Sequence, residues 1–172
     1  GGVEMTYLRA GDEYPENNRF KIVRHLGRGA YGDVYEAKDT INDYTVALKV
    51  LAPLNATNSS EQLAKWAGRE VATLEALSSP HVLRHLSHSP DIGEYNAETV
   101  GVARWIATEL LRGQSLDEFI AQNGPFRASD VLNIMGQICD GLAAAHDCKP
   151  ESIVHRDLKP ANIFVENHQS PF

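Results

Sequence analysis

Apolar and polar residues alternate through the first part of the chain and then change to a helical spacing. The alternation predicts three short strands, which begin near Phe20, Val34 and Thr45 and are separated by turns rich in Gly, Asn and Asp. Residues 60–77 place apolar side chains at helical intervals after Ser60, a residue type that can cap a helix. We therefore expect strands, with a turn tip at Asn42-Asp43, and then a helix in the first half of the chain.

The second half of the chain has mainly helical spacing. Strands are expected near residues 82–86 and 100–109, and a short helix over residues 115–122. A longer helix is expected to begin at a cap formed by Ser129 and to stop before Pro150. Its predicted apolar face consists of Val131, Ile134, Met135, Ile138, Leu142 and Ala145. This order of elements predicts an α+β fold, with a sheet-rich lobe followed by a helical one.

Composition and charge narrow the function classes. The 172 residues are 42% hydrophobic and 23% charged, which is typical of a globular domain. The net charge is −7 and neither half of the chain is basic, so we expect no nucleic-acid partner. No apolar run is long enough for a membrane-spanning helix. Cys139 and Cys148 have no C-x-x-C spacing, and we expect them to be reduced thiols in the cytoplasm.

Gly27, Gly29 and Gly32 form a G-x-G-x-x-G motif between the first two predicted strands. Glycines let the backbone approach a phosphate closely, but the same spacing also occurs in hairpins that bind nothing. Dinucleotide-binding domains need this motif between a strand and a helix, so the two-strand setting disfavours them. Taken alone, the motif leaves phosphate binding and a structural hairpin equally open.

Lys49 and Glu70 are charged residues within apolar patterns. Lys49 follows Val46, Ala47 and Leu48 in a predicted strand, where an unpaired buried ammonium would cost several kcal/mol. Glu70 lies on the apolar stripe of the predicted helix and is a candidate partner for that ammonium. From periodicity alone, exposure to solvent is the simpler interpretation of each residue.

Residues 155–162 read His-Arg-Asp-Leu-Lys-Pro-Ala-Asn and lie between two apolar stretches. Asp157 can accept a hydroxyl proton, Lys159 can neutralise a developing phosphoryl charge, and Asn162 offers an oxygen to a metal ion. A charged loop can be merely a solvated turn, but this order of residue types is too specific for that interpretation.

Together these motifs resemble those of the eukaryotic-type protein kinases, in the same order and with the same spacing, over residues 19–165. The Gly-x-Gly-x-x-Gly-x-Val sequence at residues 27–34 resembles the glycine-rich loop of that family. Lys49 resembles the strand lysine that holds the α- and β-phosphates of ATP, and Glu70 resembles its helix partner.

The resemblance extends to the catalytic loop and to the adenine site. It implies that Asp157 is the catalytic base and that Asn162 is a Mg²⁺ ligand. Lys159, two residues after Asp157, is typical of the serine/threonine class. The residues that the resemblance places around the adenine ring are Val34, Ala47, Thr108, Glu109, Leu111 and Phe164, although the family more often has Leu at the last position.

The implied fold is an antiparallel five-stranded N-lobe sheet with one key helix, followed by the beginning of a mainly helical C-lobe. Residues 1–18 are expected to form a flexible lead-in to a partial kinase domain over residues 19–172. Within that domain, residues 19–112 would form the N-lobe and hinge, and residues 113–172 the start of the C-lobe. The implied activity is ATP- and Mg²⁺-dependent phosphorylation of Ser and Thr in protein substrates.

One departure from the family pattern is that no Asp-Phe-Gly sequence follows Asn162. We therefore expect the chain to be a fragment that ends before this segment and that is inactive alone. Two alternatives stay open. One is a pseudokinase-like module that binds a nucleotide or a partner without phosphotransfer, and the other is a small-molecule phosphotransferase of the kinase-like type.

Overall fold

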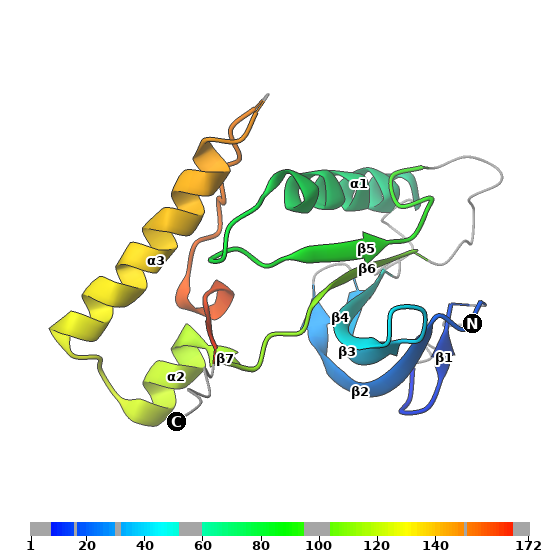
Figure 1. Ribbon diagram of the computed structural model, residues 1–172, viewed down its shortest axis with the longest axis horizontal. Coiled ribbons are helices and arrows are strands. Elements are labelled where there is room, and N and C mark those ends of the chain that lie inside the picture. The colour runs from blue at the N-terminus through cyan, green and yellow to red at the C-terminus, as the bar shows by residue number, and fades with distance from the viewer. Residues whose placement is uncertain are drawn as a thin grey trace. The chain divides into compact units, whose positions relative to one another are not determined.

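The computed structural model describes residues 8–15, 17–29, 32–51, 60–94, 104–149 and 151–166. The chain divides into two compact units, of which the first comprises residues 1–74 and 85–110 and the second residues 75–84 and 111–172. The first unit contains the strands β1 (Glu13–Tyr14), β2 (Phe20–Gly29), β3 (Gly32–Asp39), β4 (Tyr44–Leu51), β5 (His85–His88) and β6 (Arg104–Glu109), and most of the helix α1 (Ser60–Ala76) (Figure 1).

The strands of the first unit form one antiparallel sheet in the order β1-β2-β3-β4-β6-β5. Five of these strands make up the expected sheet. The sixth, β1, lies within the predicted lead-in, where Glu13 pairs with Lys21 and Tyr14 with Phe20. Glu13 and Tyr14 are thus fixed to the sheet by backbone pairing, and residues 1–7 and 16 of the lead-in lie outside the described part of the chain.

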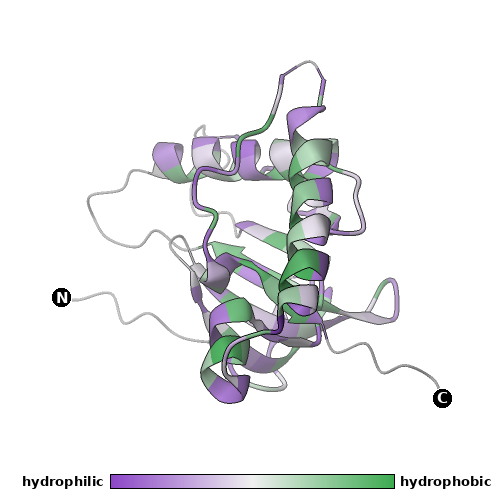
Figure 2. Ribbon diagram, turned by 90° about the vertical axis from the view of Figure 1, so that its left-hand side faces the viewer, coloured by the Kyte–Doolittle hydropathy of each residue, from purple (hydrophilic) through white to green (hydrophobic). Residues whose placement is uncertain are grey.

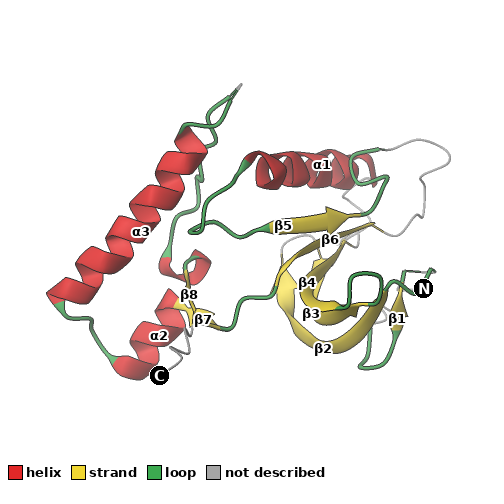
Figure 3. Ribbon diagram, in the orientation of Figure 1, coloured by secondary structure: helices red, strands yellow, loops and turns green. Residues whose placement is uncertain are grey.

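The sheet has an apolar core on each face. Val46 and Leu48 of β4 are completely buried in a cluster with Phe20, Ile22, Tyr35, Ala37, Trp105 and Ala107. Because side chains alternate along a strand, Lys49 and Leu51 point to the other face. There Leu51 and Ile106 pack against Leu63, Ala67 and Val71 of α1, the helix that runs beside β5 in Figure 3.

Several predicted boundaries of the first unit are confirmed or adjusted. The turn at Asn42-Asp43 is present between β3 and β4, with Asp43 at a φ of +57°. The helix predicted over residues 60–77 is α1, but nothing tests the Ser60 cap because its side chain lies outside the description. The strand expected near residues 82–86 is instead β5, at His85–His88.

The second unit contains β7 (Gly113–Ser115), α2 (Leu116–Asn123), α3 (Ala128–His146), the short 3₁₀ helix η1 (Pro160–Asn162) and β8 (Phe164–Glu166). The prediction that Ser129 caps α3 is wrong. Arg127 is the cap residue, with extended backbone angles, and its carbonyl accepts the N–H groups of Asp130 and Val131 at 3.0 and 3.1 Å. The helix cap therefore lies two residues before Ser129, the position that residue preference predicts.

Much of the apolar surface of α3 is exposed within its unit. Val131 and Met135 of the predicted apolar face are exposed, while Ala145 is buried. Gly141 is also buried, and a Cβ there would lie 2.9 Å from the carbonyl oxygen of His81. Figure 2 shows apolar and polar positions distributed along the helices. In the part of the chain that the structure describes, no helix is long and apolar enough to cross a membrane.

Candidate active site

Lys49 and Glu70 form an ion pair between the sheet and α1. The Lys49 ammonium lies 3.0 Å from both carboxylate oxygens of Glu70. Their side chains are 21% and 26% exposed, so the pair is partly sheltered from water but open on one side. The paired arrangement implied by the family resemblance is therefore present, and the solvent-facing alternative suggested by periodicity alone is wrong for both residues.

The local sequence explains why these two side chains meet. Lys49 is paired in register with Val34 on β3 and Ile106 on β6, so it occupies a central strand. The α1 residues Ala67 and Val71 are buried against this face of the sheet. Glu70 lies next to this apolar stripe in the helix, so packing of α1 brings its carboxylate to the ammonium.

The glycine motif lies in the hairpin formed by β2 and β3. Its register pairs Gly27 with Val34 and Gly29 with Gly32, while Ala30 and Tyr31 lie outside the description. A Cβ at Gly32 would lie 2.0 Å from the carbonyl oxygen of Val50, so only glycine fits at this position without moving β4. The predicted setting between two strands is confirmed.

The candidate adenine-site residues of the first unit lie on adjacent strands. Ala47 is paired with Thr108, and Val34 with Lys49, so these four side chains share one face of the sheet by register and alternation. Ala47 and Thr108 are only half-buried, and therefore leave surface for a ligand on this face. Glu109, at the end of β6, is paired with Val46 and belongs to the opposite face.

In the second unit, the loop of residues 155–162 gathers three candidate catalytic side chains. The Asp157 Oδ2 atom lies 2.8 Å from the ammonium of Lys159. The Asn162 side-chain nitrogen donates to the same Oδ2 atom at 2.9 Å and to the Asp157 carbonyl at 2.8 Å. The Asp157 carboxylate is nevertheless 65% exposed, so a substrate group can reach it.

These contacts control the protonation of Asp157. The hydrogen bonds from Lys159 and Asn162 hold the pKa of the Asp157 carboxyl below its usual value, and the charges of Lys159 and His155 act in the same direction. Asp157 is therefore a carboxylate at neutral pH, and it can accept a hydrogen bond from a hydroxyl group.

Backbone contacts give the loop its shape. Arg156 adopts a φ of +62°, and the Asn162 N–H donates to the Lys159 carbonyl at 2.9 Å within η1. Beyond η1, β8 pairs with β7, and Phe164 lies opposite Ser115. The Leu116 N–H at the start of α2 donates to the Ile163 carbonyl at 2.8 Å. The loop is thus held by the short hairpin and by α2.

Asn162 is suited to bind a divalent cation. Its side-chain nitrogen is directed to Asp157 by the two hydrogen bonds described above, which leaves the amide oxygen for a metal ion. Amide and carboxylate oxygens are the ligands that hard divalent cations prefer. The amide oxygen of Asn162 therefore fits such an ion chemically.

The structure divides the predicted site residues between the two units. The first unit holds Gly27, Gly29, Gly32, Val34, Ala47, Lys49, Glu70, Thr108 and Glu109, and the second holds Leu111, Asp157, Lys159, Asn162 and Phe164. One residue that the sequence analysis did not single out also contacts this set. The ring of Trp66 lies 4.3 Å from the Lys49 ammonium, and its position one helical turn before Glu70 is the signal that could have identified it.

Comparison with known proteins adds to these observations. The chain matches the family described as "Protein kinase domain" over residues 20–171. It is 34% identical over 151 residues to the serine/threonine-protein kinase PrkC of Bacillus subtilis, and the matched region covers 88% of this chain and 21% of PrkC. It is also 34% identical over 146 residues to the serine/threonine-protein kinase PknD of Mycobacterium tuberculosis, and this match covers 85% of this chain and 20% of PknD.

The fold of this chain is also similar to that of a solved structure. The PknI kinase domain of Mycobacterium tuberculosis superimposes with a TM-score of 0.70 at 25% identity, over 95% of this chain and 60% of that chain. The chain spans about a fifth of the length of the curated relatives named above.

Proposed function

The chain belongs to the protein kinase domain family, and on that premise we propose that its residues transfer the γ-phosphoryl group of ATP to Ser or Thr hydroxyls of protein substrates. Protein kinases are enzymes that use ATP together with a divalent cation. The observation that carries the proposal is the Asp157 carboxylate, which is held by Lys159 and Asn162 and yet remains exposed. The names of the relatives support the serine/threonine class.

Asp157 orients the nucleophile in this proposal. Its ionised carboxylate accepts a hydrogen bond from the substrate hydroxyl. It takes up the proton as the hydroxyl oxygen bonds to the γ-phosphorus and the bond from that phosphorus to the leaving ADP oxygen breaks. The same carboxylate also orients the hydroxyl oxygen for its attack on the phosphorus. Lys159 places a positive charge beside the same carboxylate, where it can offset the charge on the transferred phosphoryl group.

Lys49 binds the nucleotide phosphates in this proposal. Glu70 fixes the ammonium through both carboxylate oxygens, and a remaining N–H of the ammonium can donate to a phosphate oxygen. The backbone at Gly27, Gly29 and Gly32 would contact the phosphates. The proposed adenine contacts are Val34, Ala47, Thr108, Glu109, Leu111 and Phe164.

We propose Mg²⁺ as the divalent cation and Asn162 as one of its ligands. When bound, the ion would neutralise charge on the nucleotide phosphates. The support from this chain is the Asn162 amide, whose nitrogen is directed to Asp157 and whose oxygen is available as a hard ligand.

The remaining proposals concern partners and location. A protein substrate is supported by the kinase relatives, and the net charge of −7 argues against nucleic acid. Cys139 and Cys148 are both free thiols, which supports the reducing cytoplasm as the site of this domain.

The test of the proposed function is Asp157→Asn in the complete gene product that carries this chain. We expect phosphorylation of a protein substrate to fall by at least about 100-fold, because the asparagine cannot accept the proton, while ATP binding is retained. Asp140→Asn, on the exposed surface of α3, is the matched control and should leave both properties unchanged. An Asp157→Asn enzyme with undiminished activity would refute the assignment.

A further inference from the structure

The indole of Trp66 lies over the ammonium of Lys49, on the same helix that supplies Glu70. The Lys49 nitrogen is 4.3 Å from the centre of the Trp66 ring, well within the distance at which a cation is attracted to an aromatic face. Trp66 is half-buried and Lys49 is only 21% exposed, so this contact is partly shielded from water. Such shielding strengthens the attraction.

Trp66 and Glu70 act on the ammonium from adjacent turns of α1. They are four residues apart, a spacing that places two side chains on the same helical face. Glu70 attracts the ammonium with its two carboxylate oxygens, each 3.0 Å from the nitrogen, and these oxygens accept hydrogen bonds from N–H groups of the ammonium. The aromatic face of Trp66 attracts the charge without requiring a particular N–H direction. A donor of the ammonium can therefore turn to a ligand while the nitrogen stays in place.

We propose that Trp66 is a positioning residue for Lys49, and that it holds the ammonium beside Glu70, ready to bind the phosphate groups of a nucleotide. The lysine stem has four flexible bonds, so a fixed ammonium has lost much of its rotational freedom before the ligand arrives. This inference rests on the proposed role of Lys49 in nucleotide binding.

A packing role is the alternative that the experiment must separate. Trp66 also packs against the buried cluster that contains Leu63, Ala67 and Val71, so its loss affects the stability of the first unit. Packing needs only apolar volume, whereas the proposed role needs an aromatic face over a cation. Trp66→Phe retains an aromatic face, and Trp66→Leu retains apolar character without one.

The first measurement tests the contact without any nucleotide. In NMR spectra of the isotopically labelled chain, protons above an aromatic ring are shifted upfield. We expect the ε-methylene protons of Lys49 to lie upfield of those of the exposed Lys38 and Lys65, and Lys49→Arg identifies them by their loss. The upfield shift should be reduced but present in Trp66→Phe and absent in Trp66→Leu. Lys49 protons at ordinary positions in the unmodified chain would overturn the proposal.

The second measurement tests the consequence for binding in the complete gene product. We expect Trp66→Leu to weaken ATP binding by roughly three- to thirty-fold and to leave adenosine binding nearly unchanged, because only ATP carries phosphates. Trp66→Phe should restore most of the ATP affinity. In the Lys49→Met background, Trp66→Leu should have no further effect on ATP affinity, because the cation is already absent.

The outcomes separate failure of this inference from failure of the proposed function. Equal loss of ATP and adenosine affinity in Trp66→Leu would indicate a packing role and overturn the inference. If the unmodified protein binds ATP no better than adenosine, the phosphate-binding role of Lys49 fails and the inference fails with it. If Trp66→Leu does not fold, the Lys49 resonances of the unmodified chain and of Trp66→Phe still decide the matter.

Discussion

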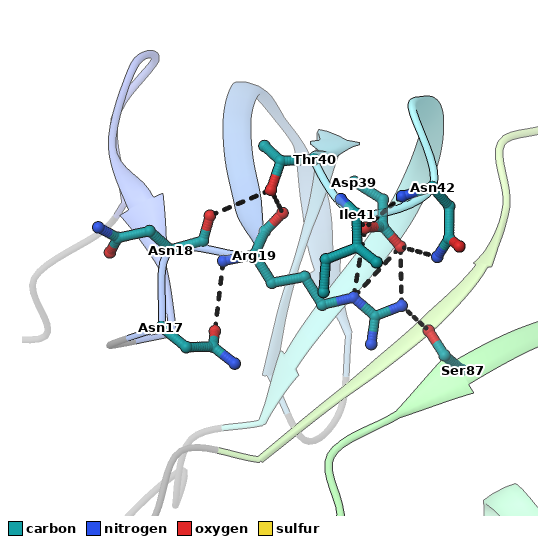
Figure 4. Close-up of polar contacts among 8 residues, drawn as sticks. All are labelled: Asn17, Asn18, Arg19, Asp39, Thr40, Ile41, Asn42 and Ser87. Carbon is teal, nitrogen blue, oxygen red and sulfur yellow. Dashed lines mark hydrogen bonds and ion pairs between the residues drawn. The ribbon is translucent and has the colours of Figure 1, made fainter.

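The guanidinium of Arg19 is paired with the carboxylate of Asp39, whose side chain is completely buried. The Arg19 Nη2 atom lies 2.7 Å from Asp39 Oδ2 and also donates to the Ser87 hydroxyl at 3.0 Å (Figure 4). Asp39 further accepts the Ile41 N–H at 3.0 Å and the Asn42 side-chain N–H at 2.9 Å. The Asp39 carboxylate thus joins Arg19, which directly precedes β2, to the β3–β4 turn, and Arg19 extends this network to Ser87 of β5.

We predict that Arg19→Ala destabilises the first unit by about 3–5 kcal/mol, because it leaves the Asp39 carboxylate buried without its cation. Arg19 also lies over the rings of Phe20 and Trp105, at 4.9 and 5.0 Å, so packing is lost as well. The measurement is the free energy of unfolding from urea denaturation.

The control for Arg19→Ala is Arg24→Ala, which removes another arginine–carboxylate pair from the same sheet. Arg24 bonds Glu36 at 2.7 Å, but its side chain is 65% exposed. Its loss should therefore change the unfolding free energy by only about 0–1 kcal/mol. Equal effects of the two substitutions would show that burial of Asp39 adds nothing to the strength of its pair.

Acid should weaken the fold through the same carboxylate. Burial alone would raise the pKa of Asp39, but hydrogen bonds from Arg19, Asn42 and the Ile41 N–H, together with the Arg19 charge, lower it below its usual value. A carboxyl whose pKa is lowered by folding stabilises the folded state above its ordinary pKa of about 3.9. This stabilisation is lost as the pH falls through the lowered folded-state pKa.

We therefore expect the unfolding free energy to decrease below about pH 4, and the decrease to be smaller in Asp39→Asn, which cannot titrate there. The experiment is urea denaturation of both proteins at several pH values between 7 and 2. An identical dependence on pH in the two proteins would remove Asp39 as a source of the acid sensitivity.

The sequence predicted the family and the fold class, and both are confirmed by the family match and by the PknI structure. The motifs succeeded because phosphate chemistry requires particular residue types at particular spacings. Periodicity by itself was less reliable, because it favoured a solvent-facing Glu70, whereas packing of α1 directs that carboxylate to Lys49. The individual roles of the site residues stay predictions.

Two other features could not be predicted, because they depend on contacts with residues distant in the sequence or on the backbone path. Asp39 precedes a turn and has the appearance of an ordinary turn residue, since its partner Arg19 is 20 positions away. Ser129 is a favoured cap type, but the chain enters α3 from an extended Arg127. Cap position depends on the backbone path before the helix, which residue preference does not determine.

Gly32→Ala should disrupt the glycine hairpin. Its added Cβ would lie 2.0 Å from the Val50 carbonyl oxygen, so β3 or β4 must move, at a cost of roughly 1–3 kcal/mol in unfolding free energy. Gly27→Ala is the matched control, because nothing lies within 4 Å of its Cβ position. We expect a change within about 0.5 kcal/mol for Gly27→Ala. Urea denaturation compares the two, and a Gly32→Ala protein as stable as Gly27→Ala would contradict the close approach.

Glu70→Gln should weaken ATP binding by about tenfold in the complete gene product, because the glutamine has no charge to hold the Lys49 ammonium. The pair is only partly buried, which keeps the effect below that of a fully desolvated ion pair. Glu61→Gln is the control on the same helix, where Glu61 bonds Lys65 at 2.6 Å on the exposed surface. Calorimetric titration with ATP should detect a loss for Glu70→Gln and none for Glu61→Gln. Unchanged ATP affinity in Glu70→Gln would mean that the ammonium reaches its binding position without this carboxylate.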